Sequence, residues 1–368
     1  MSLRRRNLIV HAALGTAALA VGAPVWSQPV WPQDWTPGSG KYAQRPDVLR
    51  WVEDVAQRRS LEPDWVRQAI ASAAYQPRVA QLILPPARSA AKNWRSYRSR
   101  FVEPVRIRRG AAFWSRNRQT LARAQQQYGV PPEIIVGILG VETIYGQNMG
   151  NFRVLDALAT LAFDYPTGPA NAANRQAYFR DELEHFLTLC QRISLTPGDP
   201  LGSYAGAMGM PQFMPSNWLR YATDFDGDGR IDLWHSDADA IGSVANYLRA
   251  YGWVPGMPTH YAVRLTSAVS RADLDALLAP DILPTFRPAA FTAKGAQLDD
   301  AALPHPGLLA LVELQNGDPF APGNAPTYVA GTENFYAVTR YNHSSYYAMA
   351  VIELGEQVAA TLEDRATP

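Results

Sequence analysis

One apolar segment, residues 134–143, constrains the fold of this chain more than any other feature. It consists almost entirely of aliphatic residues and glycine, and it follows the sequence Gly-Val-Pro-Pro-Glu at residues 129–133. Glycine favours the end of one helix, while proline in the first turn and an acid near the positive end favour the start of the next. The pattern therefore predicts an apolar helix that begins just after this sequence.

The charged residue of this predicted helix is Glu142. It follows Ile134 and Ile138 at four-residue steps, so the three side chains lie on one face of the helix. Partial burial disfavours the ionised carboxylate and raises its pKa, as a general acid requires. The segment alone leaves a second interpretation open, in which Glu142 is solvated at the helix end or paired with an arginine.

Helical periodicity also dominates the rest of the chain. A Gly-rich stretch occupies residues 202–215, and prolines multiply between residues 261 and 341, where short apolar runs at 261–265 and 308–314 are typical of strands. We therefore expect an α+β fold that is mainly α, with a small β-rich insert. Apolar residues recur at helical spacing in residues 43–128, 179–189, 239–251 and 344–362.

Composition narrows the function classes. The chain has 368 residues and is 47% hydrophobic, which is enough for two or three compact units. Its 34 basic and 33 acidic residues give a net charge of +1, so no global positive field attracts nucleic acid. Cys190 is the one cysteine, which excludes an intrachain disulfide and a thiolate zinc cluster. We interpret it as a small core residue.

The first 27 residues have the order of an export signal, with Arg4, Arg5 and Arg6 before an apolar stretch and a return to polarity near Ser27. Residues 1–27 are predicted to be a signal peptide or an uncleaved N-terminal anchor, followed by a linker at 28–42. Ordinary secretion is favoured over the twin-arginine route. No cysteine lies near the cleavage region, so lipid attachment is not expected there, and the predicted location is the periplasm.

Several motifs, in order, resemble the lytic murein transglycosylase B family. They read GVETIYG at 140–146, GNFRVLDAL at 150–158, GSYAGAMG at 202–209 and PQFMPS at 211–216. Shorter matches at 224–228, 239–247 and 340–342 extend the resemblance from about residue 47 to residue 362. Such agreement over several long segments is specific.

The resemblance implies a lysozyme-like catalytic core flanked by a helical domain and a small β-rich domain. On this chain the implied boundaries are a helical domain at 43–128 that includes parts of the core, a core at 129–258, a β-rich domain at 259–340, a C-terminal helix at 341–362 that returns to the core, and a tail at 363–368.

The resemblance also implies a reaction. Glu142 protonates the glycosidic oxygen between MurNAc and GlcNAc and then acts as base on the C6 hydroxyl of the same muramic acid, which closes a 1,6-anhydro ring. One carboxylate performs both roles, whereas most glycosidases use two. Asp156 and Asp164 are the nearby acids, and neither is expected to be catalytic. No catalytic cofactor is implied.

Other functions remain open at this level. A hydrolytic muramidase would cut the same bond with water, and a noncatalytic wall-binding or scaffold protein would keep the cleft without the chemistry. A calcium-responsive interaction protein is a third alternative. The expected partners are peptidoglycan glycan strands and, further, proteins of cell-wall synthesis or remodelling, and the chain is expected to be a monomer.

By the same resemblance, several residues are expected to contact substrate. The segment after Asn174 departs from the family, because residues 165–174 are longer than usual and only Arg175 stands where two arginines are typical; Pro211 replaces a glycine of some relatives. The best matches are Ser203, Gln212 and Phe213, and the weaker ones, for sugar and peptide contacts, are Tyr97, Arg175, Tyr178, Tyr247, Tyr341, Asn342 and Tyr347.

A candidate calcium loop lies at residues 224–239. Its acids occupy the first, third, fifth and ninth positions and a glycine the sixth, which is EF-hand spacing. His235 stands at the twelfth position in place of the usual glutamate, and the family resemblance implies that a later acid closes the loop. A hydrated acidic turn is the alternative. The ligands implied for a structural Ca²⁺ are Asp224, Asp226, Asp228, the carbonyl of Arg230, and Asp239.

Overall fold

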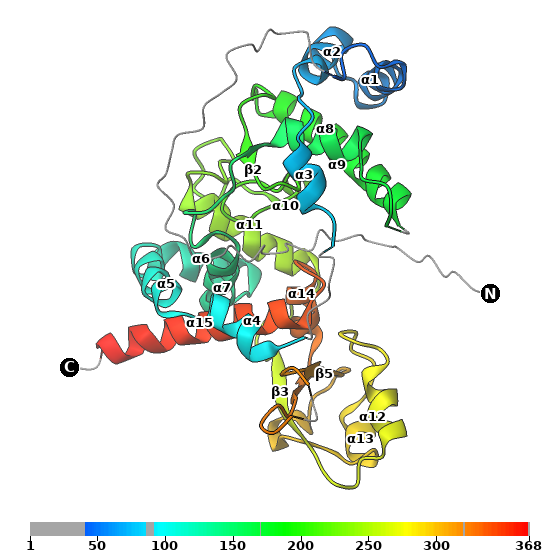
Figure 1. Cartoon of the computed structure of the whole chain (residues 1–368). Coiled ribbons are helices and arrows are strands. Elements are labelled where there is room, and N and C mark those ends of the chain that lie inside the picture. Colours follow the sequence, from blue (N-terminus) through cyan, green and yellow to red (C-terminus); the bar gives the residue numbers. More distant parts are fainter. Residues whose placement is uncertain (1–40, 86–91, 170, 319–320, 367–368) are drawn as a thin grey trace. The chain divides into compact units, whose positions relative to one another are not determined.

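The computed structural model describes residues 41–85, 92–169, 171–318 and 321–366 (Figure 1). Helices form most of it, and a four-stranded sheet lies in one region, so the predicted α+β, mainly α class is confirmed. The predicted signal peptide and almost all of the predicted linker lie outside the described residues. None of the described helices combines the length and apolar character that crossing a membrane requires.

The described residues form two compact units. The first contains residues 41–85 and 149–220, and the second contains residues 92–148 and 221–366. Each unit combines segments from more than one of the domains predicted above, because the chain passes from one unit to the other three times. The predicted domain boundaries therefore stay a prediction.

The first unit is built around a buried helix, α8 (Val154–Phe163). Every residue of α8 is buried, because its sequence is mostly apolar and its two polar side chains, Asp156 and Thr160, accept hydrogen bonds from the chain around them. The longer α9 (Ala172–Arg192) packs along it. Cys190 of α9 is buried in this core, as predicted. The other elements of the unit are α1 (Pro46–Arg59), α2 (Pro63–Ala71), α3 (Pro77–Leu82), β1 (Phe152–Arg153), β2 (Leu201–Gly202) and α10 (Pro215–Tyr221).

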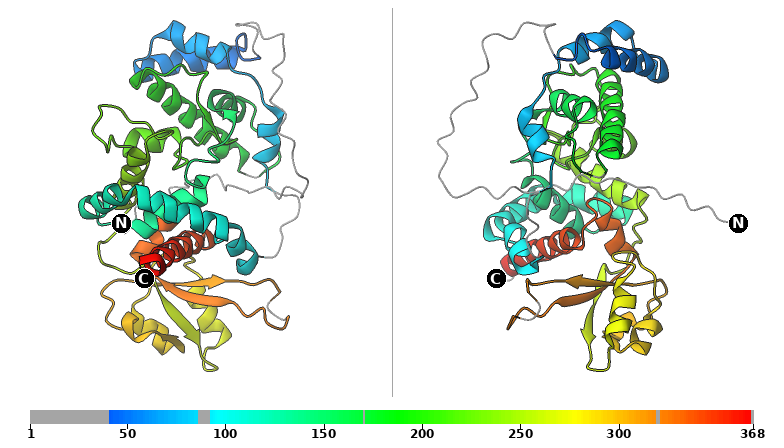
Figure 2. Two further views of the ribbon diagram at one scale, coloured as in Figure 1. Left: turned by 90° about the vertical axis from the view of Figure 1, so that its left-hand side faces the viewer. Right: turned by 45° about the vertical axis from the view of Figure 1, so that its right-hand side comes forward.

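The second unit is centred on the predicted apolar helix, which is α7 (Pro132–Thr143). The C-terminal helix α15 (Ser345–Ala366) packs along α7 and also contacts α4 and α5 (Figures 1 and 2). Glycines allow this approach, because a Cβ at Gly137 or Gly355 would overlap a backbone carbonyl of the facing helix. The other helices here are α4 (Trp94–Phe101), α5 (Pro104–Arg116), α6 (Arg118–Tyr128), α11 (Asp237–Ala250) and α14 (Glu333–Thr339).

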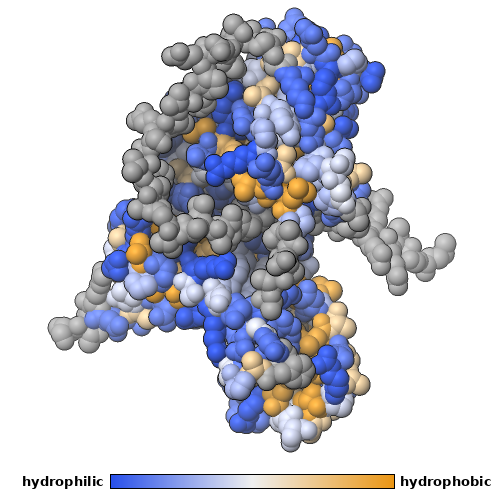
Figure 3. All heavy atoms as spheres, viewed as in Figure 1, coloured by the Kyte–Doolittle hydropathy of each residue, from blue (hydrophilic) through white to orange (hydrophobic). Residues whose placement is uncertain are grey.

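The β-rich part of the second unit is an antiparallel sheet in the order β4-β3-β6-β5. Helices α12 (Arg271–Leu278) and α13 (Pro288–Ala293) cover one face, where Leu277 and Phe291 join a buried cluster. Figure 3 shows apolar surface on this part, where Leu283 and Leu303 are exposed. The two predicted strand regions are confirmed. The bounds are β3 (His260–Leu265), β4 (Ala296–Leu298), β5 (Ala310–Leu314) and β6 (Thr327–Gly331), with a 3₁₀ turn at Asp300–Ala302.

Candidate active site

The end of α7 places Glu142 in the last turn of the helix, directly before a sharp change of direction. Three consecutive residues then have positive φ, namely Ile144 (53°), Tyr145 (58°) and Gly146 (86°). The amides of Ile144 and Tyr145 donate to the carbonyls of Gly140 and Leu139, which caps the helix. A β-branched residue rarely adopts this conformation, so tertiary packing holds the turn that follows Glu142.

The carboxyl group of Glu142 has a defined partner and an unusual pKa. The hydroxyl of Tyr347, on α15, donates to Oε1 of Glu142 over 2.6 Å. Burial raises the pKa of Glu142 from 4.5 to about 7, and the bond from Tyr347 opposes part of that rise. The negative end of the helix also disfavours a carboxylate in the last turn. Glu142 therefore holds a proton to near neutral pH while its residue stays half-buried.

The alternative of an arginine-paired glutamate does not fit these contacts. Within the described part of the chain no cationic side chain pairs with Glu142, and the shift in its pKa arises from burial opposed by one hydrogen bond. An arginine beside it would have lowered the pKa and favoured the ionised form.

Several tyrosines of the second unit form a cluster around Tyr347. Its ring stacks on Tyr341 with centroids 6.3 Å apart, and Tyr341 lies 4.8 Å from the ring of Tyr247. The hydroxyl of Tyr247 donates to the carbonyl of Arg340 over 2.7 Å. Burial, and then the charge of Glu142, raise the pKa of Tyr97 to about 12. Four of the predicted substrate tyrosines are thus grouped near Glu142.

Two of these tyrosines are more enclosed than a sugar platform requires. Tyr247 and Tyr347 are 3% and 2% exposed, and both hydroxyls have protein partners. Tyr347 contacts the predicted acid directly, a role that sequence reasoning did not assign. No local signal could have revealed it, because 205 positions separate the two residues. Asn342 lies half-buried in the loop between α14 and α15.

The remaining predicted substrate residues lie in the first unit. Three of them, Ser203, Gln212 and Phe213, are on the loop between β2 and α10. The Oγ of Ser203 accepts from the amides of Ala205 and Ala207, and Phe213 exchanges backbone hydrogen bonds with Met208. Gln212 has a φ of 51°, and its Nε2 donates to the carbonyls of Met149 (3.1 Å) and Gly209 (2.9 Å). Side-chain contacts therefore hold a strained backbone here, and the amide oxygen of Gln212 can accept from a ligand.

A buried acid that sequence reasoning missed supports this loop. Glu182 of α9 is 3% exposed and accepts from both the amide (2.9 Å) and the hydroxyl (2.6 Å) of Ser216 at the start of α10. No sequence motif indicated the role of Glu182.

Arg175 and Tyr178, two further predicted substrate residues, come from the first turns of α9. The guanidinium of Arg175 lies 5.8 Å from the ring of Tyr165, and Tyr178 packs edge-on against Phe179.

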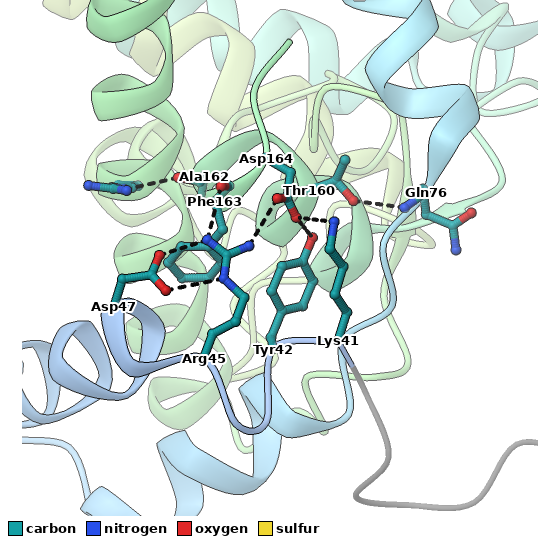
Figure 4. A network of polar contacts seen from close by, with 10 residues as sticks. Lys41, Tyr42, Arg45, Asp47, Gln76, Thr160, Ala162, Phe163 and Asp164 are labelled. Atoms are coloured by element: carbon teal, nitrogen blue, oxygen red, sulfur yellow. Dashed lines mark hydrogen bonds and ion pairs between the residues drawn. The ribbon is translucent and has the colours of Figure 1, made fainter. Parts of the chain in front are cut away.

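The two other acids considered as catalytic partners have structural contacts. Asp156 is 2% exposed and accepts from the amide of Ala74 and from Gln76. Asp164, at the end of α8, binds Lys41 (3.0 Å), Tyr42 (2.9 Å) and Arg45 (2.9 Å), as Figure 4 shows. The contacts of Asp164 attach the segment before α1 to the end of α8, and those of Asp156 attach the segment between α2 and α3 to α8. Both acids therefore have structural partners.

The acidic loop brings three of its predicted ligands together. Carboxylate oxygens of Asp224, Asp226 and Asp239 lie within 4.8 Å of one another. The carboxylate of Asp228 instead accepts from the amide of Arg230 over 2.8 Å and is not in this group. Oxygen ligands alone suit a hard cation such as Ca²⁺.

The charges around Asp224, Asp226 and Asp239 also favour a bound cation. Asp239 is 1% exposed at the start of α11, and its pKa is raised by burial and further by the charge of Asp226. The turn that brings the acids together needs Gly227 and Gly229, with φ of 80° and 88°. Among the described residues no cationic side chain pairs with the three acids, so a bound cation would relieve their repulsion.

Comparison with known proteins defines the class to which this chain belongs. The family model of the transglycosylase SLT domain matches residues 44–356, and the chain belongs to that family. It is a lytic murein transglycosylase, an enzyme that acts on peptidoglycan. The resemblance noted in the sequence is therefore confirmed.

Relatives cover nearly the whole chain. Over 333 residues this chain is 38% identical to membrane-bound lytic murein transglycosylase B of Escherichia coli strain K12. The aligned region covers 87% of this chain and 84% of that protein. E. coli lytic transglycosylase SLT35, solved in complex with calcium, has 37% sequence identity to this chain and a TM-score of 0.74. The match covers 91% of this chain and 100% of SLT35. Pseudomonas aeruginosa SltB3 in complex with NAG-anhNAM-pentapeptide is 28% identical, with a TM-score of 0.67 over 87% and 80%.

Proposed function

We propose that Glu142 carries both proton transfers of a nonhydrolytic cleavage of the bond between MurNAc and GlcNAc. In the first step its carboxylic acid donates a proton to the glycosidic oxygen, the bond from that oxygen to C1 of MurNAc breaks, and GlcNAc leaves with a free hydroxyl. In the second step the carboxylate removes the proton of the C6 hydroxyl, whose oxygen bonds to C1. The product end is 1,6-anhydro-MurNAc, and Glu142 regains its proton.

The observation that carries this proposal is the pKa of about 7, which allows one carboxyl to serve as acid and then as base. The Tyr347 hydroxyl holds Oε1, which orients the carboxyl group and stabilises its ionised form between the two steps. Ligand chemistry in SltB3 supports the product, since that relative was solved with an anhydro-muramyl peptide.

Product analysis tests the reaction. Purified sacculi are digested with the wild-type enzyme and with Glu142→Gln, and the released fragments are weighed by mass spectrometry. We expect anhydro ends, lighter by one water than hydrolysed ends, and a loss of activity by a factor of at least 10³ in the variant. Hydrated, reducing ends would identify a muramidase instead. Full cleavage by Glu142→Gln would remove the acid from the mechanism.

Calcium is proposed as a structural ion. Asp224, Asp226 and Asp239 would hold it, with the carbonyl of Arg230 and with Asp228 after reorientation, and the ion would neutralise their charge. The calcium complex of SLT35 supports this assignment. We expect added Ca²⁺ to raise the melting temperature of the wild type but not of Asp239→Asn. No binding in calorimetry would reject the site.

The place of action follows from the substrate. Because the enzyme acts on peptidoglycan, we propose that the N-terminal segment directs its export to the periplasm, as its composition predicts. N-terminal sequencing of protein from a periplasmic fraction tests this, and protein retained in the cytoplasm would contradict it. Binding of other cell-wall proteins and the monomeric state stay predictions.

A further inference from the structure

Positive charge is distributed very unevenly along this chain. Residues 92–132 contain ten basic residues and one acid, Glu103, although the whole chain carries a net charge of only +1. These residues form helices α4, α5 and α6 of the second unit. The acid is already engaged, because its carboxylate caps α5 by accepting from the amides of Val105 and Arg106. Such local asymmetry indicates an anionic partner.

Some of the ten cations have partners inside the protein. Arg98 pairs with Glu353, and Arg116 pairs with Asp237 at 2.8 Å. Arg106 donates to the carbonyl of Gly140 at the end of the catalytic helix. These side chains are explained by the fold.

Three others are exposed, one in the last turn of α4 and two in the second turn of α5. We call Arg100, Arg108 and Arg109 the basic surface. The guanidinium of Arg106 reaches the backbone carbonyl of Arg100, which holds the last turn of α4 beside the first turn of α5. Within the described residues no carboxylate pairs with any of the three. All three side chains are exposed and positively charged, so they are available to an external anion.

Tyr97 lies electrostatically between the basic surface and the candidate active site. Arg100 lies on α4 three residues after Tyr97, and the charge of Arg100 lowers the pKa of Tyr97 while the charge of Glu142 raises it. One tyrosine is therefore within electrostatic reach of both the acid and the first arginine. A polymer bound near Glu142 can extend past Tyr97 toward α5.

We propose that the basic surface binds the carboxylates of the stem peptides of peptidoglycan and so holds the polymer beside Glu142. This inference rests on peptidoglycan as the substrate and assigns a surface of the enzyme to its peptide part. Stem peptides carry free carboxylates, and many stems project from one glycan strand. Arginine suits this ligand, because its planar guanidinium binds carboxylate in a bidentate manner.

An anionic lipid surface fits the same residues less well. A helix that lies on a membrane needs an exposed face rich in large apolar residues. The apolar residues of α5 are mostly turned inward, with Ala111 and Phe113 buried, and α5 packs on α7 and α15. Val105 is the large apolar residue that α5 leaves exposed, at 42%. The surface therefore resembles an electrostatic site for a polyanion.

The test compares substrates with and without stem peptides. The variant Arg108→Gln/Arg109→Gln keeps good helix formers on the exposed side of α5. Its matched control, Arg50→Gln/Arg192→Gln, removes the same charge from exposed residues of the first unit. Both are made in the Glu142→Gln background for cosedimentation with intact sacculi, and in the active enzyme for turnover of intact and of amidase-stripped glycan. Vesicles of phosphatidylglycerol and phosphatidylethanolamine provide the lipid arm.

We expect the test variant to bind intact sacculi roughly tenfold more weakly at low ionic strength, with a shallower salt dependence. It should lose less activity on stripped glycan, which keeps only the lactyl carboxylate of each MurNAc, than on intact glycan. Adding Arg100→Gln should weaken binding further, and the control should bind like the parent. Equal losses in test and control would overturn the proposal, and so would unchanged sacculus binding with lost vesicle binding. Because cosedimentation needs no catalysis, an enzyme that released no anhydro product would refute the proposed reaction without affecting this result.

Discussion

Replacing Glu142 by glutamine should make the protein more stable at alkaline pH, although the proposed mechanism expects the same change to abolish activity. The pKa of this carboxyl rises from 4.5 in the unfolded chain to about 7 in the folded protein, because burial disfavours the charge. Below pH 4.5 both states hold the proton. Between pH 4.5 and pH 7 the unfolded chain releases it and the folded protein keeps it, so the free energy of unfolding falls.

The magnitude follows from this difference of about 2.5 pK units. Each unit corresponds to about 1.4 kcal/mol, which gives a loss of about 3.5 kcal/mol between pH 4.5 and pH 8. Because the residue keeps some exposed surface, solvent screening reduces this to between about 2 and 3 kcal/mol. Glutamine is a neutral side chain of the same size, so the variant lacks this loss.

Urea unfolding from pH 4 to pH 9 measures the effect. The difference in unfolding free energy between Glu142→Gln and the wild type should increase in the variant's favour through the window from pH 4.5 to pH 7 and then stay level. Taking the difference between two proteins cancels the titration of all other groups. Parallel profiles for the two proteins would refute the claim that burial keeps this carboxyl protonated, and with it the physical basis for its role as a general acid.

Three further outcomes follow from named contacts. Tyr347→Phe removes a bond that lowers the pKa of Glu142, so the alkaline limb of the pH–rate profile should move to higher pH while the rate falls by about tenfold to a hundredfold, measured by turnover of sacculi. Gly355→Ala places a methyl group against the carbonyl of Glu133, so it should lower the melting temperature by several degrees, equivalent to about 1–3 kcal/mol. Removing bound calcium with a chelator should lower the melting temperature of the wild type and leave Asp239→Asn unchanged, as calorimetry would detect.

Local patterns were sufficient for the elements that carry the site. The proline and glycine before residue 134 and the apolar run after it predicted α7, and four-residue spacing put Glu142 on that helix. The same kind of pattern predicted β3, β5 and the C-terminal helix. These features depend on residues within one or two turns of each other, and short-range sterics and hydrogen bonds decide them.

The family motifs indicated which residues belong to the site but not which atoms those residues contact. They indicated Tyr347 as a contact for sugar or peptide, whereas the structure has its hydroxyl bound to Glu142. They indicated four acids as metal ligands without their arrangement, and the structure brings Asp224, Asp226 and Asp239 together while the carboxylate of Asp228 accepts from a backbone amide. A motif records which side chain stands at a position, and hydrogen-bond partners depend on what folds against it.

The amino-acid sequence by itself determined the mainly helical class, the apolar helix and the acid at its end, because periodicity and capping act within a segment. Tertiary structure alone decided the proton affinity of that acid, since α15 must pack on α7 to bury Glu142 and to bring Tyr347 within 2.6 Å. It likewise decided which arginines between residues 92 and 132 remain unpaired. Burial and charge pairing join residues far apart in the chain, and no pattern along the chain encodes them directly.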